Sequence, residues 1–180
     1  MTAPRLRVQG TAPGVVSLSG VIDEAAGLDA VLPLAVDARL RLDLGGVTFV
    51  NSVGVRDWIH LLAAAAAAGV AIELVRVSEP MVQQLNMIVA TRGHAAVRSF
   101  VAPYACDACG HEEARLLELA EHGDTLRAGA PPPAPCPACP SPMAFDDFPE
   151  RYLAFLTDER RVPAAVTLAP AVTSVAQEPG

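Results

Sequence analysis

Four cysteines, arranged as two C-x-x-C pairs, constrain the fold of this 180-residue chain more than any other feature. Cys106 and Cys109 form the first pair, and Cys136 and Cys139 form the second after 26 intervening residues. Each pair can hold two thiolates on one side of a metal ion, so two pairs suit a tetrahedral Zn²⁺ site. The pattern predicts a structural zinc ribbon, with a linker longer than the roughly 15–20 residues of common ribbons.

The cysteines leave three other interpretations open. The four thiols could be unrelated, one C-x-x-C pair could be a redox site, or His111 could replace one thiolate as a ligand. A redox site is disfavoured because neither pair lies at the strand-to-helix joint that such motifs occupy. Four thiolates also leave no open position on zinc for a catalytic water, so we expect no enzymatic activity.

The charge of the chain argues against nucleic acid as a partner. The net charge is −7, and all 13 basic residues are arginines. Between residues 104 and 156, three arginines stand against nine acidic residues, a balance of −6. A zinc centre of four thiolates adds about two more negative charges. Because phosphate contacts need a basic face, we expect this segment to stabilise the fold or to dock a protein.

The first hundred residues alternate between strand and helix patterns, which predicts an α/β fold with a mixed sheet covered by helices. The expected strands cover residues 5–10, 14–22, 39–44 or 39–50, 71–77 and 95–102, the first two as a hairpin. The expected helices cover 23–35, about 53–68 and 78–93. Pro33 should end or kink the first helix, and Ser78 is the expected N-cap of the last.

The composition changes near residue 102. Residues 112–123 are rich in Glu and predict a helix, whereas residues 130–142 hold too many prolines for a regular element. We therefore expect three parts: an α/β domain over 1–101, the zinc ribbon over 102–157, and a disordered tail over 158–180.

No segment of the sequence predicts insertion into a membrane. The first ten residues contain no apolar run of the signal-peptide kind. The most apolar stretch, residues 59–72, is shorter than the about 20 residues that a spanning helix needs. We therefore expect a cytoplasmic protein that has no membrane partner. In the cytoplasm, cysteines are more often metal ligands than disulfides.

The joint between the strand at 39–50 and the next helix reads Asn51-Ser52-Val53-Gly54. Together with VVSLSGVID, LRLDLGGVTFV and IELVRVSEPMVQQLNMI, it resembles the STAS domain (sulphate transporter and anti-sigma factor antagonist) over about residues 5–101. Gly20, Asp43, Ser52 and Gly54 carry most of the resemblance. It implies a mixed sheet covered by helices, followed here by the ribbon instead of the usual carboxy-terminal helix.

The resemblance also implies a function in partner switching. In anti-sigma factor antagonists, a serine kinase that is itself the anti-sigma factor phosphorylates the serine of a D-S-x-G joint. By position the phosphoacceptor is Ser52, and Asn51 stands where the family usually has Asp. We expect a signalling protein that binds a protein partner, such as a kinase or anti-sigma factor in transcription regulation, through Asn51, Val53, Gly54 and Arg56.

Two alternatives to this function remain. Many STAS domains bind partners without phosphorylation, so the chain could be a scaffold in which the STAS-like part and the ribbon both dock proteins. Ser52 could also be a plain helix N-cap, which is worth about 1 kcal/mol. No Glu or Gln lies three residues further on, because Val55 occupies that position, and a capping box is therefore excluded.

Overall fold

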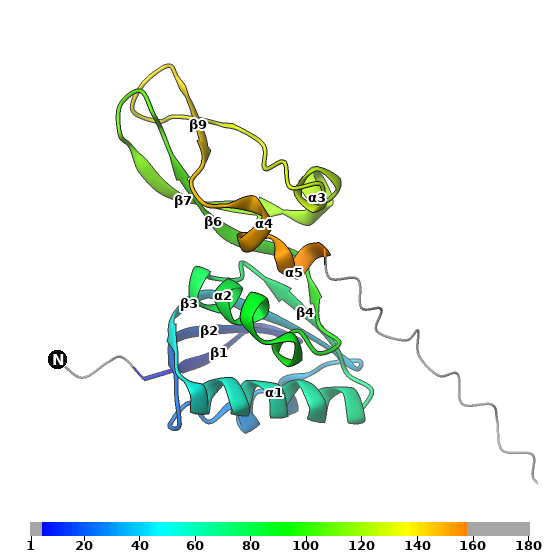
Figure 1. The fold of residues 1–180 in the computed structure, drawn as a ribbon. Helices are drawn as coiled ribbons and strands as arrows, with labels where there is room; N and C mark the ends of the chain where they lie inside the picture. Colours follow the sequence, from blue (N-terminus) through cyan, green and yellow to red (C-terminus); the bar gives the residue numbers. More distant parts are fainter. Residues whose placement is uncertain (1–4, 158–180) are drawn as a thin grey trace, which may run out of the picture.

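The computed structural model describes residues 5–157, which form an α/β fold built on two β-sheets (Figure 1). The first sheet and its two helices take up residues 5–98. The second sheet and three short helices take up residues 99–157 and lie above the first part in Figure 1. The predicted disordered tail, residues 158–180, lies outside the described residues.

The first sheet has five strands in the order β1-β2-β3-β4-β5. Their bounds are Arg7–Ala12, Val15–Ile22, Arg39–Val50, Ala71–Val75 and Ala96–Val97. β1 and β2 pair antiparallel, which confirms the hairpin, and the pairs from β2 to β5 are all parallel. The sheet is therefore mixed, as the sequence predicts.

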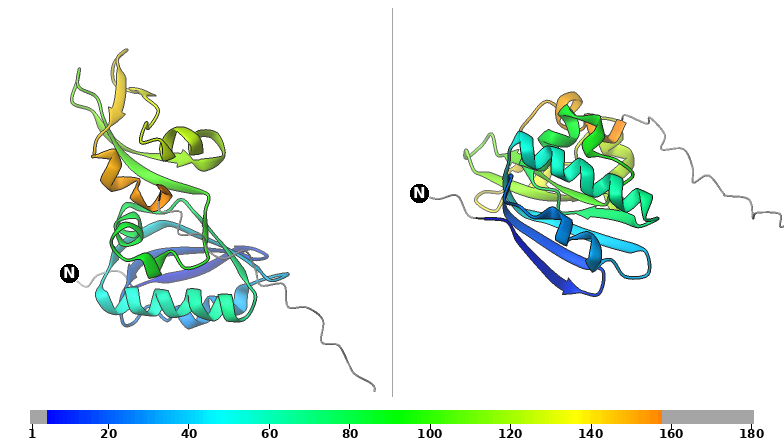
Figure 2. Two further views of the ribbon diagram at one scale, coloured as in Figure 1. Left: turned by 45° about the vertical axis from the view of Figure 1, so that its right-hand side comes forward. Right: turned by 90° about the horizontal axis from the view of Figure 1, so that it is seen from below.

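Two helices cover one face of this sheet. α1 spans Ser52–Ala67 and α2 spans Glu79–Met87. The right-hand view of Figure 2 shows them beside each other on the same side of β1 and β2. The strands pack fully buried aliphatic side chains against these helices: Val16, Leu18, Leu40, Leu42, Leu44 and Leu74. The alternating residues of β3, such as Arg39 and Arg41, are exposed on the opposite face.

Two predicted helices are wrong in type or length. Residues 23–35 form two 3₁₀ turns, Leu28–Ala30 and Leu32–Leu34, because Gly27 adopts a left-handed backbone and Pro33 interrupts further turns. The helix that follows Ser78 ends at Met87 rather than near Gly93, since Ile88 is extended. Ser78 is its N-cap residue, but its buried hydroxyl has no hydrogen-bond partner within residues 5–157.

The second sheet has the strand order β7-β6-β9-β8. β6 spans Ser99–Ala105, β7 spans Glu112–Glu118, β8 spans Ala134–Pro135 and β9 spans Pro142–Phe145. The helix predicted over 112–123 is therefore wrong in its first half, because residues 112–118 form strand β7. This strand pairs with β6 along the whole length of both strands. Helix α3, Leu119–Arg127, begins only after that strand. The single strand predicted over 95–102 is in fact β5 and the start of β6, which belong to different sheets.

The two parts share a packed junction. Helices α4, Pro149–Tyr152, and α5, Ala154–Thr157, follow β9 and pack on α2. The ring of Phe100 at the start of β6 meets the rings of Phe155 and Tyr152, with centroids 5.2 and 6.4 Å away. The side chain of Asn86 on α2 donates a hydrogen bond to the carbonyl of Tyr152 and accepts one from the N–H of Phe155, both 2.8 Å long.

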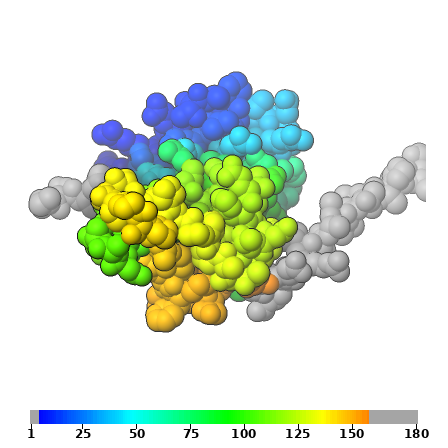
Figure 3. All heavy atoms as spheres, turned by 90° about the horizontal axis from the view of Figure 1, so that it is seen from above, coloured from blue at the N-terminus to red at the C-terminus, as the bar shows by residue number. Residues whose placement is uncertain are grey.

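The second part covers the first only in places. Seen from above in Figure 3, residues 99–157 (green to orange) lie over the centre, whereas the blue strands β1 and β2 and the light-blue turn before β3 lie at the edge. Within residues 5–157, no helix is both long and apolar enough to cross a membrane.

Candidate functional site

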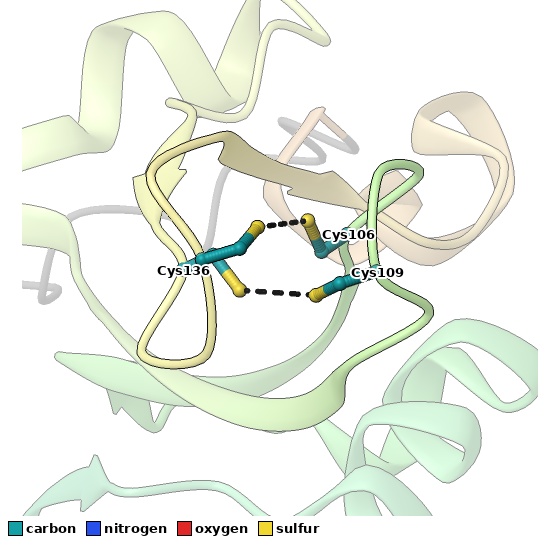
Figure 4. Close-up of side chains that lie close together, drawn as sticks. Cys106, Cys109 and Cys136 are labelled. Carbon is teal, nitrogen blue, oxygen red and sulfur yellow. Dashed lines mark hydrogen bonds between the residues drawn. The ribbon is translucent and has the colours of Figure 1, made fainter.

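The structure brings the four predicted cysteines together. Their sulfur atoms all lie within 4.8 Å of one another, and the four thiols are free. Cys106 Sγ is 3.5 Å from Cys139 Sγ, and Cys109 Sγ is 3.6 Å from Cys136 Sγ, so each contact joins one C-x-x-C pair to the other (Figure 4). The four thiols form a cluster that can hold a metal ion.

The spacing of the sulfur atoms suits a small tetrahedral ion. A zinc–sulfur bond of about 2.3 Å in a tetrahedron places neighbouring sulfur atoms about 3.8 Å apart. The two contacts across the cluster are within a few tenths of an ångström of that value. Four soft thiolates are also the donor set typical of zinc or iron rather than of magnesium or calcium.

Backbone hydrogen bonds shape both cysteine loops. In the loop between β6 and β7, the N–H of Gly110 bonds to the carbonyl of Cys106, and the N–H of Cys106 bonds to the carbonyl of His111. Gly110 has a φ of 71°, a conformation that side chains other than glycine's disfavour. In the second loop the N–H of Ala138 points to Cys136 Sγ at 3.4 Å. The loops are therefore turned so that their thiols face one another.

The surroundings of Cys106 and Cys109 shift the pKa values of their thiols in opposite directions. Burial raises the pKa of Cys106, but hydrogen bonds from the backbone N–H groups of Cys109 and Ala108 and from nearby thiols lower it to about 7. The N–H of His111 favours the thiolate of Cys109, yet the surrounding thiols and burial raise its pKa to about 12. A metal ion must therefore displace protons from the cluster when it binds.

His111 does not belong to the cluster. Its Nε2 lies 3.4 Å from Glu113 Oε2, and the group of possible ligands that includes the cysteines contains no histidine. Arg115 also contacts this carboxylate, and its hydrogen bond lowers the pKa of Glu113. Within residues 5–157, the other three histidines form no metal-ligating group either.

The second candidate site is the joint before α1, where the structure assigns the cap to Asn51. Asn51 Oδ1 accepts a hydrogen bond of 2.8 Å from the N–H of Gly54, three residues into the helix. Its Nδ2 donates one of 3.0 Å to Glu24 Oε2. Hydrogen bonds from its own backbone and from Asn51 lower the pKa of Glu24. Asn51 thus ties the helix start to the loop after β2.

Ser52 is consequently not the cap. It is the first residue of α1 and is exposed, and within residues 5–157 its hydroxyl makes no hydrogen bond. Val53 is half-buried beside it, and Arg56 is exposed one turn further on, where it contacts the carboxylate of Asp57. The hydroxyl is accessible and has no part in holding the fold.

Gly54 has a packing role. A Cβ atom at this position would lie 2.1 Å from the carbonyl oxygen of Ile22, a distance that no side chain can adopt. The helix start therefore lies directly against the end of β2, and Gly54 is buried there. Of the four residues predicted to contact a partner, Gly54 is the one that the fold covers.

Phe49 is a surface residue that the sequence pattern does not predict. The period-2 pattern of β3 breaks at Gly45 and Gly46, so the alternation up to Leu44 does not predict which side chains face outward beyond it. Phe49 is 55% exposed, two positions before the capping Asn51. Only the structure shows this exposure, and an exposed aromatic side chain is a candidate contact for a partner.

No known protein family, curated protein or solved structure matches the chain. The thiol cluster and the joint before α1 are therefore the two features of the chain that indicate its function.

Proposed function

We propose that this chain is a regulatory protein-interaction module of the partner-switching kind, in which phosphorylation of Ser52 releases a protein partner. The observation that supports this proposal best is that the helix cap and the exposed hydroxyl belong to different residues at the joint. Asn51 caps the helix, while the neighbouring Ser52 hydroxyl is exposed and forms no bond within the described residues. The resemblance of residues 5–101 to STAS-type anti-sigma factor antagonists supports the proposal, because it implies a phosphoacceptor at the same residue.

The fold can accept a phosphate at this position. Asn51 uses the N–H of Gly54, which leaves the N–H groups of the first helical residues to face a phosphate on Ser52. The helix dipole favours negative charge at this end, and Arg56 lies one turn along the same helix. A charge of roughly −2 therefore alters the surface more than the stability.

The partner surface proposed here centres on Phe49 and Ser52. Phe49 supplies an exposed aromatic, and aromatic side chains often contribute most to binding energy. Asn51, Val53 and Arg56 complete the surface, and buried Gly54 acts only by positioning the helix. A partner that packs an apolar or acidic surface here loses affinity when a phosphate enters the contact.

We further propose that the thiol cluster holds a structural Zn²⁺ ion. Cys106, Cys109, Cys136 and Cys139 would supply all four ligands, which leaves no position for a catalytic water. Zinc here would supply folding free energy rather than reactivity. It would make residues 99–157 a stable extension of the interaction module.

The proposal is tested by measuring phosphorylation and binding separately. Mass spectrometry of the chain isolated from its own cell should find phosphate on Ser52. Partners retained by the unmodified chain should also be retained by Ser52→Ala and lost by Ser52→Asp, with the melting temperature nearly unchanged. Ala63→Asp places the same charge on an exposed position in the middle of α1 and should retain the partners. Equal binding by Ser52→Asp and the unmodified chain would refute the switch.

A second candidate function is a scaffold that binds partners without phosphorylation. It is favoured by the bond from Asn51 to Glu24, because an Asp at position 51 would place two carboxylates together. With Asn51, the joint carries one negative charge fewer than the Asp-Ser sequence that is usual in STAS-type anti-sigma factor antagonists. If Phe49→Ala abolishes partner binding while Ser52→Asp does not, the scaffold function is the correct one.

A further inference from the structure

An arginine-lined hollow lies at the end of the first sheet opposite Ser52. It has a volume of about 800 Å³ and is bordered by the β1–β2 turn, the start of β3, the start of β4 and the residue after β5. In Figure 1, the light-blue turn before β3 is on the right, whereas α1 begins on the left. Arg39, Arg41 and Arg98 all line this hollow. Neither the thiol cluster nor the joint before α1 borders it.

A tight turn places Arg39 at the rim. Asp37 and Ala38 both have positive φ values, of 50° and 55°, and backbone hydrogen bonds in both directions between Val36 and Arg39 close the turn. Within residues 5–157, the guanidinium of Arg39 has no hydrogen bond or ion pair and its residue is exposed. It is therefore an available donor held on a defined turn.

The other two arginines share a single carboxylate. Arg41 contacts Glu73 Oε2 at 2.8 Å, and Arg98 contacts Glu73 Oε1 at 2.6 Å. Hydrogen bonds from Arg41 and Arg98 lower the pKa of Glu73, which stays charged at neutral pH. Each guanidinium has five N–H donors and uses two of its nitrogens on Glu73, so both retain N–H groups for a further acceptor.

The charge of the hollow is opposite in sign to that of the chain. Three arginines and two acidic residues, Asp37 and Glu73, line it, which gives a net charge of +1 in a chain of net charge −7. Its remaining border is apolar, with Pro13, Val15 and Val36. A ligand with anionic groups at one end and carbon atoms at the other matches this lining.

We propose that this hollow binds a small organic anion that carries phosphate or carboxylate groups. Arg39 would donate to one anionic group and Arg41 and Arg98 to another, while the apolar rim contacts the carbon skeleton. Arginine suits this role because its planar fork pairs with two oxygen atoms of either group. The site is independent of Ser52 phosphorylation and of the metal.

The test uses the full chain, calorimetry at low ionic strength, and two probes, pyrophosphate and citrate. Heat of binding identifies the anionic group that the protein prefers, and the variants below show whether the probe binds in the hollow. Arg39→Ala should lower the affinity by about tenfold, the loss of one hydrogen bond between charged groups. Arg127→Ala, which removes an exposed arginine from α3, outside the hollow, should leave the affinity unchanged.

Two further variants should change the affinity for the probe in the opposite direction. Glu73→Gln frees both arginines from their shared carboxylate, and Asp37→Asn removes a negative charge while keeping a residue type that tolerates a positive φ. Both should raise the affinity, whereas a merely structural role for these residues predicts no gain. Amide chemical shifts should move at Gly14, Ala71 and Arg98. The proposal is overturned if neither probe binds, or if a probe binds with an affinity that Arg39→Ala and Asp37→Asn leave unchanged.

Discussion

The two parts of the molecule differ in how much apolar side chain they bury. In residues 5–98, strands β2 to β4 and both helices enclose a continuous core of aliphatic side chains, many of them without any solvent exposure. Near the thiol cluster, buried side chains such as Tyr104 and Met143 are few, and the strands are short. A module with so little apolar burial depends on a metal or on disulfides for its folding. Packing thus maintains the first part, and the metal proposed for the four thiols would maintain the far end of the second.

Aromatic rings at the junction connect the packed core of the first part to the region of the thiol cluster. A chain of ring contacts runs from Tyr104 through Phe145 and Tyr152 to Phe100, with centroid distances between 5.4 and 6.4 Å. Tyr104 lies two residues from Cys106, a proposed metal ligand, whereas Phe100 is fully buried beside α2. Loss of the metal should therefore disturb the outer end of β6 first and its inner end last.

The strongest test of this contrast is loss of a metal ligand. Cys139→Ser should abolish stoichiometric metal binding, because a structural zinc site supplies on the order of 10 kcal/mol that an incomplete ligand set does not provide. Elemental analysis should find one zinc per unmodified chain and much less in the variant. Hydrogen exchange should become fast in β8, β9 and the outer half of β6, while β2 and β3 stay protected.

The matched control is Ala138→Ser, which adds a hydroxyl in the same loop at an exposed position that is not a ligand. It should keep both the metal and the protection. Unchanged metal content in Cys139→Ser, or a mass that corresponds to two disulfides in the unmodified chain, would contradict the metal assignment.

The converse experiment weakens the packed part. Leu42→Ala removes a fully buried side chain from the centre of β3 and should cost about 2–5 kcal/mol of unfolding free energy. Denaturant unfolding followed by tryptophan fluorescence reports this loss, because Trp58 is buried in the same core. The variant should still bind one metal ion per chain under native conditions. Loss of the metal together with the core would show that the two parts do not differ as described.

A smaller effect is expected at the junction itself. Asn86→Ala removes both hydrogen bonds to the backbone of residues 152 and 155 and should cost about 1–3 kcal/mol, since the partner groups are partly buried. Exchange of the Phe155 amide should accelerate while the metal remains bound. Gln83→Ala changes an exposed side chain of the same helix and should leave that exchange rate unaltered. If the two variants behave alike, the Asn86 bonds do not hold the junction.

What the sequence predicted correctly depended on local patterns. The alternation of β3, the turn between β1 and β2, and the paired spacing of the cysteines each express a rule within a few residues. The strand over 112–118 escaped prediction because its Glu- and Leu-rich composition favours a helix, and only its pairing with β6 overrides that preference. The capping role of Asn51 escaped for a different reason, since both Asn and Ser are favourable caps and the structure alone distinguishes them.

The smallest expected effect concerns the exposed face of the packed part. Glu73 pairs with Arg41 and Arg98, whose hydrogen bonds lower its pKa in the folded chain below its ordinary value of 4.5. The folded state therefore binds the proton less readily than the unfolded state, and the pair stabilises the fold fully at pH values above 4.5. This contribution disappears as the pH falls through the lowered folded pKa. Glu73→Gln lacks it at every pH, so the two chains should differ by less than about 1 kcal/mol at neutral pH and converge in acid. Urea unfolding of both chains across this pH range measures the difference, and a gap that widens in acid would show that the pair does not act in this way.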